Sequence, residues 1–158
     1  MADLPAPGDP APPFEGVDQN GNPVRLEDFS GRPLALYFYP KDDTPGCTKQ
    51  ACNLRDNMAA LASDGVAVVG VSPDDQASHQ RFADKYALPF SLLADPDKTI
   101  LEAYGAWGEK TLYGRKSVGV KRTTFLIGPD GRILHVFKRP KTADHAQEIL
   151  SKLSLHHS

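Results

Sequence analysis

Cysteine is scarce in this sequence, with two residues among 158, and so few cysteines cannot form a disulfide scaffold. No apolar run is long enough to cross a membrane, so no membrane partner is expected. Basic residues are not in excess: the formal net charge is −2 at pH 7, which leaves no electrostatic footprint for nucleic acid. Residues 1–5 lack the basic and apolar parts of a secretory signal, which favours a reducing cytoplasm. In that compartment a cysteine pair is more often redox-active or metal-binding than structural.

The length of the chain fits one domain, residues 1–158, that is large enough to bury a substantial core. Five of the fourteen prolines fall between residues 4 and 13, and they predict an extended arm over residues 1–13. Residues 155–158 are expected to form a flexible tail. The dipeptide Asn20-Gly21 lies between two short apolar segments and predicts a tight β-hairpin turn.

The middle of the chain alternates between apolar strands and amphipathic helices. Residues 34–39 and 66–71 are continuous apolar runs, as in strands that are covered on both faces. A helix over residues 45–63 is predicted to connect them, and a second helix carries His79 on its apolar face. This alternation indicates parallel βαβ units.

Near the C-terminus the pattern changes. Residues 123–127 and 133–137 flank a Gly-Pro turn and predict an antiparallel hairpin, followed by a helix with Thr142 as its cap. Taken together, the elements predict an α/β protein with a central mixed β-sheet flanked by helices. Residues 105–121 are glycine-rich and basic, and they are predicted to form a surface loop. Two interpretations of Trp107 in that loop remain open, a cover for the active site or a plain packing residue.

Cys47 falls at a junction that suits a reactive thiolate. Pro40 ends the strand over residues 34–39, and Thr44 is placed to cap a helix whose first residue is Pro45. Cys47 then lies in the first helical turn, where unpaired backbone N–H groups and the positive end of the helix dipole stabilise an anion. The alternative, an ordinary buried cysteine, fits the polar neighbours of Cys47 poorly. The sequence therefore predicts a reactive Cys47.

The segment from Tyr37 to Thr48 reads Tyr-Phe-Tyr-Pro-Lys-Asp-Asp-Thr-Pro-Gly-Cys-Thr, and a second cysteine, Cys52, follows Cys47 at a distance of five residues. Its core, Pro40-x-x-x-Thr44-x-x-Cys47, resembles the active-site motif of the peroxiredoxins. The longer string with Cys52 resembles their bacterioferritin-comigratory, or Q-type, subfamily. Weaker similarity extends from about Gly8 to about Leu153.

The resemblance implies a thiol-dependent peroxidase with a thioredoxin-like fold, which agrees with the order of the predicted elements. It implies Cys47 as the peroxidatic cysteine and Cys52 as the resolving cysteine. It also implies that Pro40 shields the thiolate, and that Thr44 hydrogen-bonds both the thiolate and the bound peroxide. Arg122 matches the arginine that completes the peroxiredoxin site, where its fixed charge would stabilise the thiolate. On pattern alone, a solvated arginine at a strand edge is the alternative.

The implied substrates are hydrogen peroxide and organic hydroperoxides, and the implied reductant is thioredoxin acting on a monomer that holds both cysteines. The reaction needs no cofactor and no metal. After attack by the thiolate, a sulfenic acid on Cys47 would condense with Cys52 to form a disulfide. An intact helix places the two Cα atoms about 8–9 Å apart, whereas a disulfide needs them within about 7 Å. We therefore expect residues 45–53 to unwind after the attack.

Two other function classes fit parts of the sequence. A general thiol–disulfide oxidoreductase usually carries its cysteines as C-x-x-C, whereas the spacing here is C-x-x-x-x-C. A metal carrier would use Cys47, Cys52 and His135, although helical spacing scatters such ligands. His79 is expected to be a packed or half-exposed residue and no ligand, because no second ligand lies beside it in the sequence.

Overall fold

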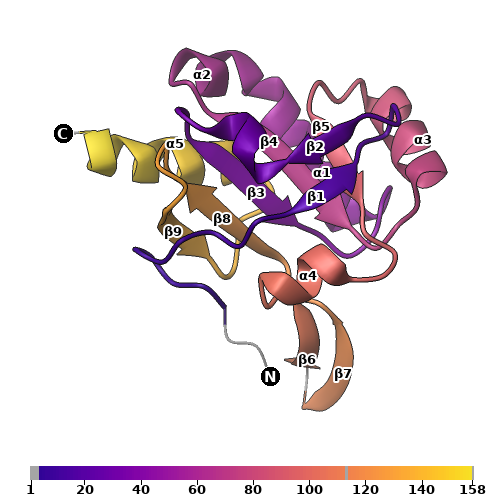
Figure 1. Ribbon diagram of the computed structural model, residues 1–158. Coiled ribbons are helices and arrows are strands. Elements are labelled where there is room, and N and C mark those ends of the chain that lie inside the picture. Colours follow the sequence, from indigo (N-terminus) through magenta and orange to yellow (C-terminus); the bar gives the residue numbers. More distant parts are fainter. Residues whose placement is uncertain (1–3, 113, 158) are drawn as a thin grey trace.

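The computed structural model describes residues 4–112 and 114–157, and a seven-stranded mixed sheet forms its centre (Figure 1). The strands are β1 (Glu15–Val17), β2 (Pro23–Arg25), β3 (Leu34–Phe38), β4 (Ala67–Ser72), β5 (Ser91–Ala94), β8 (Thr123–Ile127) and β9 (Ile133–Phe137). Their order across the sheet is β2-β1-β5-β4-β3-β8-β9. Strands β3, β4 and β5 are parallel, while β8, β9 and the β1–β2 hairpin run antiparallel to their neighbours. The predicted mixed sheet and both predicted hairpins are confirmed.

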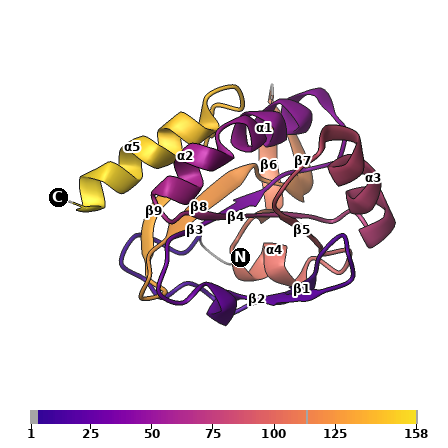
Figure 2. The ribbon, with the colours of Figure 1, turned by 90° about the horizontal axis from the view of Figure 1, so that it is seen from above.

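Helices cover the sheet on both faces, as Figure 2 shows with the sheet seen edge-on. The helices are α1 (Pro45–Asp56), α2 (Met58–Ser63), α3 (Gln76–Tyr86), α4 (Thr99–Ala103) and α5 (His145–His157), with a short 3₁₀ turn at Leu26–Phe29. Helices α1, α2, α3 and α5 lie on one face, and α4 lies on the other, next to the β1–β2 hairpin that forms one edge of the sheet. None of the described helices has the length and apolar composition needed to cross a bilayer.

Strand β3 carries the core on both of its faces, because all five of its residues are buried. Its side chains alternate between two apolar clusters, as the period of a strand requires. Tyr37 packs in the cluster that also contains Cys47, whereas Phe38 packs in the opposite cluster with Tyr104 and Phe125. The continuous apolar run in the sequence thus reflects a strand buried on both sides.

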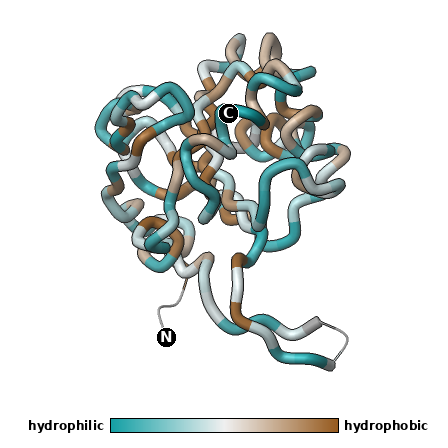
Figure 3. Tube along the Cα trace, turned by 90° about the vertical axis from the view of Figure 1, so that its right-hand side faces the viewer, coloured by the Kyte–Doolittle hydropathy of each residue, from teal (hydrophilic) through white to brown (hydrophobic). Residues whose placement is uncertain are grey.

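Two predictions about the middle of the chain are wrong. The helix predicted over residues 45–63 is broken at Asn57, which has non-helical dihedrals (φ −111°, ψ 14°) and separates α1 from α2. The loop predicted over residues 105–121 is instead a two-stranded ribbon of β6 (Trp107–Leu112) and β7 (Arg115–Val120). Figure 3 shows this ribbon standing away from the body, with mostly hydrophilic strands. Because most of the ribbon has no buried face, its sequence lacks the apolar alternation that marks a strand.

The ends of the chain also differ from expectation. Helix α5 begins at His145, three residues after Thr142, so Thr142 does not cap it, and it continues through His157 into the expected tail. The predicted extended arm is interrupted by a turn, in which the Asp9 N–H donates to the Ala6 carbonyl and Gly8 has a positive φ of 92°. Pro10 then forms an isolated bridge with Arg132 of the body. The arm prediction for residues 1–3 and the tail prediction for residue 158 lie outside the described residues.

Candidate active site

Cys47 lies in the first turn of α1 and is 1% exposed. The chain enters the helix through Asp43, which has a positive φ of 56°, and through Thr44, which is extended at the N-cap position. Pro45 follows as the first helical residue, and the Thr48 N–H donates to the Thr44 carbonyl at 2.8 Å to close the first turn. The predicted position of Cys47, beside the unpaired N–H groups of a helix start, is therefore confirmed.

Arg122 reaches Cys47 from the segment that leads into β8. Its Nη2 lies 3.1 Å from Cys47 Sγ, and its Nη1 donates to Gln50 Oε1 at 2.6 Å. A Cβ added to Gly46 would lie 3.3 Å from Nη2, so the guanidinium passes close over a residue that has no side chain. Strand β8 pairs with β3, and this pairing brings Arg122 next to the end of the strand that leads to Cys47. The contact favours the active-site role of Arg122 over that of a solvated strand-edge residue.

The Thr44 hydroxyl does not donate to Cys47 in this structure. It donates to the Lys41 carbonyl at 2.8 Å, which uses the one hydrogen that a hydroxyl can donate. Its two lone pairs remain able to accept a hydrogen bond. The N-cap position predicted for Thr44 is confirmed, while a side-chain cap bond is absent from this helix start.

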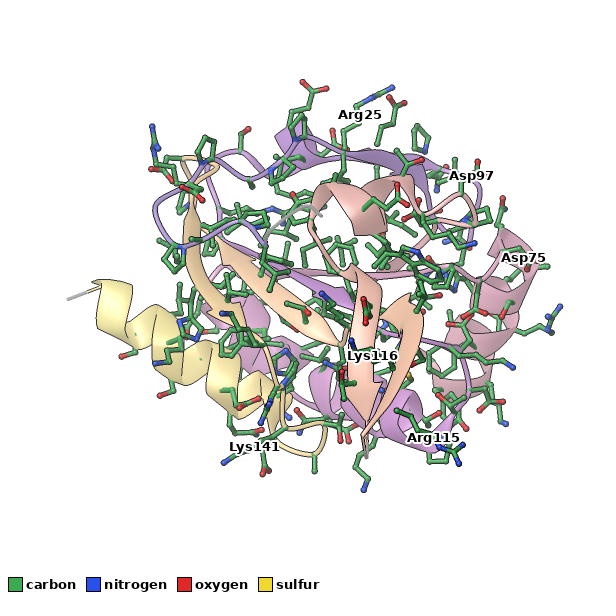
Figure 4. The ribbon with its side chains drawn as sticks, turned by 90° about the horizontal axis from the view of Figure 1, so that it is seen from below. Arg25, Asp75, Asp97, Arg115, Lys116 and Lys141 are labelled. Atoms are coloured by element: carbon green, nitrogen blue, oxygen red, sulfur yellow. The ribbon has the colours of Figure 1, made fainter. Side chains whose placement is uncertain are left out.

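Pro40 is half-buried and lines a surface hollow together with Arg122. The β6–β7 ribbon and residues 138–140 form the other walls, and no acidic residue among the described ones lines it. The basic residues of its lining, besides Arg122, are Lys110, Lys121, Lys138 and Arg139. Arg115 and Lys116 extend from the same ribbon (Figure 4).

Cys52 is half-buried on the same continuous helix as Cys47, and both cysteines are free thiols. The intact helix therefore holds the two cysteines apart, as its geometry requires. Trp107 packs against the apolar cluster that does not contain Cys47, with Lys98 Nζ 5.1 Å from the centre of its ring. Of its two interpretations, the structure favours the packing residue.

Two polar side chains beside Cys47 were missed in the sequence. Gln50 is fully buried, and its Nε2 has no hydrogen-bond partner among the described residues. The Tyr37 hydroxyl is also buried without a partner among them. Burial raises the pKa of Tyr37 well above its usual value, and the negative charge of a Cys47 thiolate raises this pKa further. Gln50 follows Cys47 by three residues, a spacing that places both side chains on one face of a helix and could have revealed it.

Of the two environments expected for His79, packed or half-exposed, the structure shows the packed one, and two carboxylates distant in the sequence lie beside its ring. Ligand atoms of Asp42, Asp74 and His79 lie within 4.8 Å of one another. Those atoms bond one another and nearby hydroxyl and backbone groups, for example Ser72 Oγ to Asp74 Oδ2 at 2.8 Å. Within the described part of the chain, no group that could share a metal includes Cys47, Cys52 or His135. The metal-carrier alternative thus gains no support.

Known proteins resemble this chain along almost its whole length. The sequence model described as the AhpC/TSA family matches residues 7–136. Peroxiredoxin Bcp from Escherichia coli (strain K12) is 48% identical over 149 residues, which cover 94% of this chain and 96% of that protein.

Solved structures agree with the sequence comparison. A mutant PrxQ from Xylella fastidiosa has a TM-score of 0.91 at 32% identity and covers 99% of this chain and 100% of its own. The bacterioferritin comigratory protein of Xanthomonas campestris has a TM-score of 0.86 at 31% identity, over 100% of both chains. Motif, fold and overall similarity agree, and the chain therefore belongs to the AhpC/TSA family, as a peroxiredoxin of the Bcp/PrxQ type.

Proposed function

We propose that Cys47 is the peroxidatic cysteine of this thiol-dependent peroxidase, and that hydrogen peroxide and organic hydroperoxides are its substrates. The proposal is carried by the 3.1 Å contact between Arg122 Nη2 and Cys47 Sγ at the first turn of α1. The helix N-terminus and the guanidinium both stabilise a thiolate, which is the nucleophilic form of cysteine. The relative from Xanthomonas campestris is described by its alkyl peroxide reduction activity, which supports organic hydroperoxides as substrates.

In the first step the Cys47 thiolate attacks the terminal oxygen of the hydroperoxide, in line with the O–O bond. A sulfur–oxygen bond forms as the O–O bond breaks. The leaving oxygen takes a proton from solvent and departs as water or an alcohol. Arg122 is placed to stabilise the negative charge that develops on the peroxide oxygens, and Cys47 is left as a sulfenic acid.

Thr44 and Pro40 complete the site in this proposal. The Thr44 hydroxyl donates to the Lys41 carbonyl and keeps its lone pairs free, so it accepts a hydrogen bond from the O–H group of the peroxide. Pro40 has no backbone N–H and lies beside Arg122 at the surface hollow, where it keeps water from the sulfur.

In the second step Cys52 resolves the sulfenic acid. Its thiolate attacks the Cys47 sulfur, the S–O bond breaks, and the oxygen leaves as water after taking a proton. Because α1 is continuous from Pro45 to Asp56, the disulfide forms only after residues 45–53 unwind. Unwinding is the gate between the two steps.

A dithiol protein such as thioredoxin then reduces the disulfide, since a bridge formed inside one short segment is strained and easily reduced. Both cysteines belong to one chain, so a monomer of one domain, residues 1–158, carries out the cycle. A reducing cytoplasm supplies such a reductant.

The first experiment is the intact mass of the reduced protein after one equivalent of hydrogen peroxide, followed by a count of free thiols. We expect the loss of two hydrogens and of both thiols. Cys47→Ser should prevent any change, because a hydroxyl group is not ionised near neutral pH. Cys52→Ser should keep the first attack and lose the disulfide. An unchanged mass of the wild type with both thiols free would contradict the proposed cycle.

The gate is tested by amide exchange across residues 45–53. We expect strong protection in the dithiol form, where α1 is intact, and weak protection in the disulfide form. Equal protection in both forms would show that the helix does not unwind.

A further inference from the structure

The loop before Cys47 is held against α3 by two consecutive aspartates that point in opposite directions. Asp43 is exposed and accepts from Lys85 Nζ and from the Tyr86 hydroxyl, each at 2.8 Å. These bonds hold Asp43 at its positive φ of 56°, which is unfavourable for a residue with a Cβ. Asp42 turns inward and is buried.

Asp42 is the centre of a hydrogen-bond network that joins the loop to the end of β3, to the β4–α3 connection and to α3. Its Oδ1 accepts from the Tyr39 hydroxyl at 2.5 Å, and its Oδ2 accepts from Ser78 Oγ at 2.8 Å. Its backbone N–H donates to Asp74 Oδ2 at 2.7 Å. The remaining partner is His79, whose Nδ1 lies 2.7 Å from Asp42 Oδ2. Asp75, labelled in Figure 4 at the start of α3, caps this helix by accepting from the Ser78 N–H.

His79 is fully buried, and both of its ring nitrogens face acceptors. Nδ1 faces the Asp42 carboxylate, and Nε2 lies 3.0 Å from the Leu93 carbonyl oxygen of β5. A neutral imidazole has one N–H and one lone pair, so it would set a lone pair against one of these oxygens. An imidazolium donates to both. The titratable groups that face the ring are Asp42, Asp74 and the Tyr39 hydroxyl, which lies 3.4 Å from Nδ1.

We propose that His79, as a buried imidazolium, is a positioning residue that acts through Asp42 to hold residues 40–44 and thereby the Cys47 turn in the attacking geometry. We call this arrangement the His79 clamp; it consists of His79, Asp42, Ser78 and Tyr39. The proposal rests on the proposed function, because the clamp would decide whether the Cys47 turn stays helical for the attack on peroxide or unwinds toward Cys52.

The two members of this buried pair depend on each other. Removing His79 leaves the Asp42 carboxylate as an unpaired buried charge, which is strongly unfavourable, so His79→Gln should release the loop.

The test compares the reduced full-length wild type, His79→Gln and a matched control, His145→Gln, at about pH 7. His145 is likewise fully buried, but it lies on α5 and bonds Thr124 and Glu148, away from the loop. Amide exchange of residues 40–44 and the rate of sulfenic acid formation with hydrogen peroxide are measured for each protein.

In His79→Gln we expect amide exchange of residues 40–44 at least about tenfold faster than in the wild type. Sulfenic acid formation should be about tenfold slower, because Cys47 is then misplaced. His145→Gln should follow the wild type in both measurements. Equal exchange and equal rates in His79→Gln and the wild type would overturn the proposal.

A measurement on the wild type decides the case even where the variant does not fold. Nitrogen NMR of the His79 ring should show protons on both nitrogens in the reduced protein near neutral pH, and a neutral ring would overturn the clamp. Failure of the proposed function can be told apart from failure of the clamp. A wild type that forms no sulfenic acid refutes the peroxidase cycle. The clamp is then tested by amide exchange and NMR alone.

Discussion

Arg122 Nη2 lies 3.1 Å from Cys47 Sγ, although the two residues are separated by 75 positions in the sequence. The same guanidinium bonds Gln50 through its other terminal nitrogen, so its plane is fixed by two partners on one helix. A lysine has a single charged nitrogen and cannot occupy both positions. The geometry therefore requires arginine, beyond the need for a positive charge.

Arg122→Lys should slow sulfenic acid formation by about a hundredfold, and Arg122→Ala should slow it at least as much. The reason is the loss of directed donors at the sulfur and at the peroxide oxygens. Stopped-flow kinetics with excess hydrogen peroxide measures the step directly. Arg81→Ala, which removes an exposed arginine on α3, is the control and should leave the rate unchanged. A wild-type rate in Arg122→Lys would show that charge alone is sufficient.

Thr44→Val should slow the same step by about tenfold, because the valine keeps the shape of threonine and loses the oxygen that accepts from the peroxide. Thr44→Ser keeps that oxygen and should react close to the wild-type rate. Both variants need a check of the free energy of unfolding, since valine also loses the bond to the Lys41 carbonyl. Equal rates in the two variants would remove the Thr44 hydroxyl from the reaction.

The parts of the site that the sequence predicted are those with a local cause. Cys47 at a helix start follows from Pro45 and from the end of an apolar strand, all within a few residues. The bond between Asp42 and His79 joins residues 37 positions apart, and no periodic pattern marks either of them. Arg122 was found through the resemblance, because its approach to Cys47 depends on the pairing of β8 with β3.

The β6–β7 ribbon could not be predicted for a different reason. Most of its residues are exposed, so no buried face imposed the alternation of apolar and polar residues that identifies a strand. Backbone pairing joins the two strands, with few side-chain contacts such as that between Lys116 and Glu109, and glycines in both strands made the segment resemble a loop. Such a strand pair can be recognised only when the pairing of its two strands is known from the structure.

Tyr37→Phe should raise the free energy of unfolding by about 1 kcal/mol, because it removes a buried hydroxyl that has no partner among the described residues. The ring of Tyr37 also leaves no room for a side chain at Gly70, because a Cβ added there would lie 2.8 Å from the ring's Cζ. Gly70→Ala should therefore destabilise the protein by about 1–3 kcal/mol through overpacking. Urea unfolding of the three proteins gives both values, and a less stable Tyr37→Phe would mean that the hydroxyl is bonded in solution.

His145 should make the fold sensitive to acid. Burial lowers the pKa of His145 below its ordinary value, although Glu148, which bonds its Nδ1 at 2.9 Å, opposes this shift. The folded state therefore binds a proton less readily than the unfolded chain does. The stability that depends on neutral His145 is complete above the unfolded pKa, about 6.5, and it is lost as the pH falls toward the lower folded value.

The free energy of unfolding, measured in urea between about pH 5 and pH 7.5, should therefore fall on acidification, with a slope from this residue of at most about 1.4 kcal/mol per pH unit. His145→Gln should flatten that slope. Glu148→Gln should enlarge the loss, because it removes the group that helps the folded state to hold the proton. If the slope were the same in wild type and His145→Gln, other groups would have to cause the acid sensitivity.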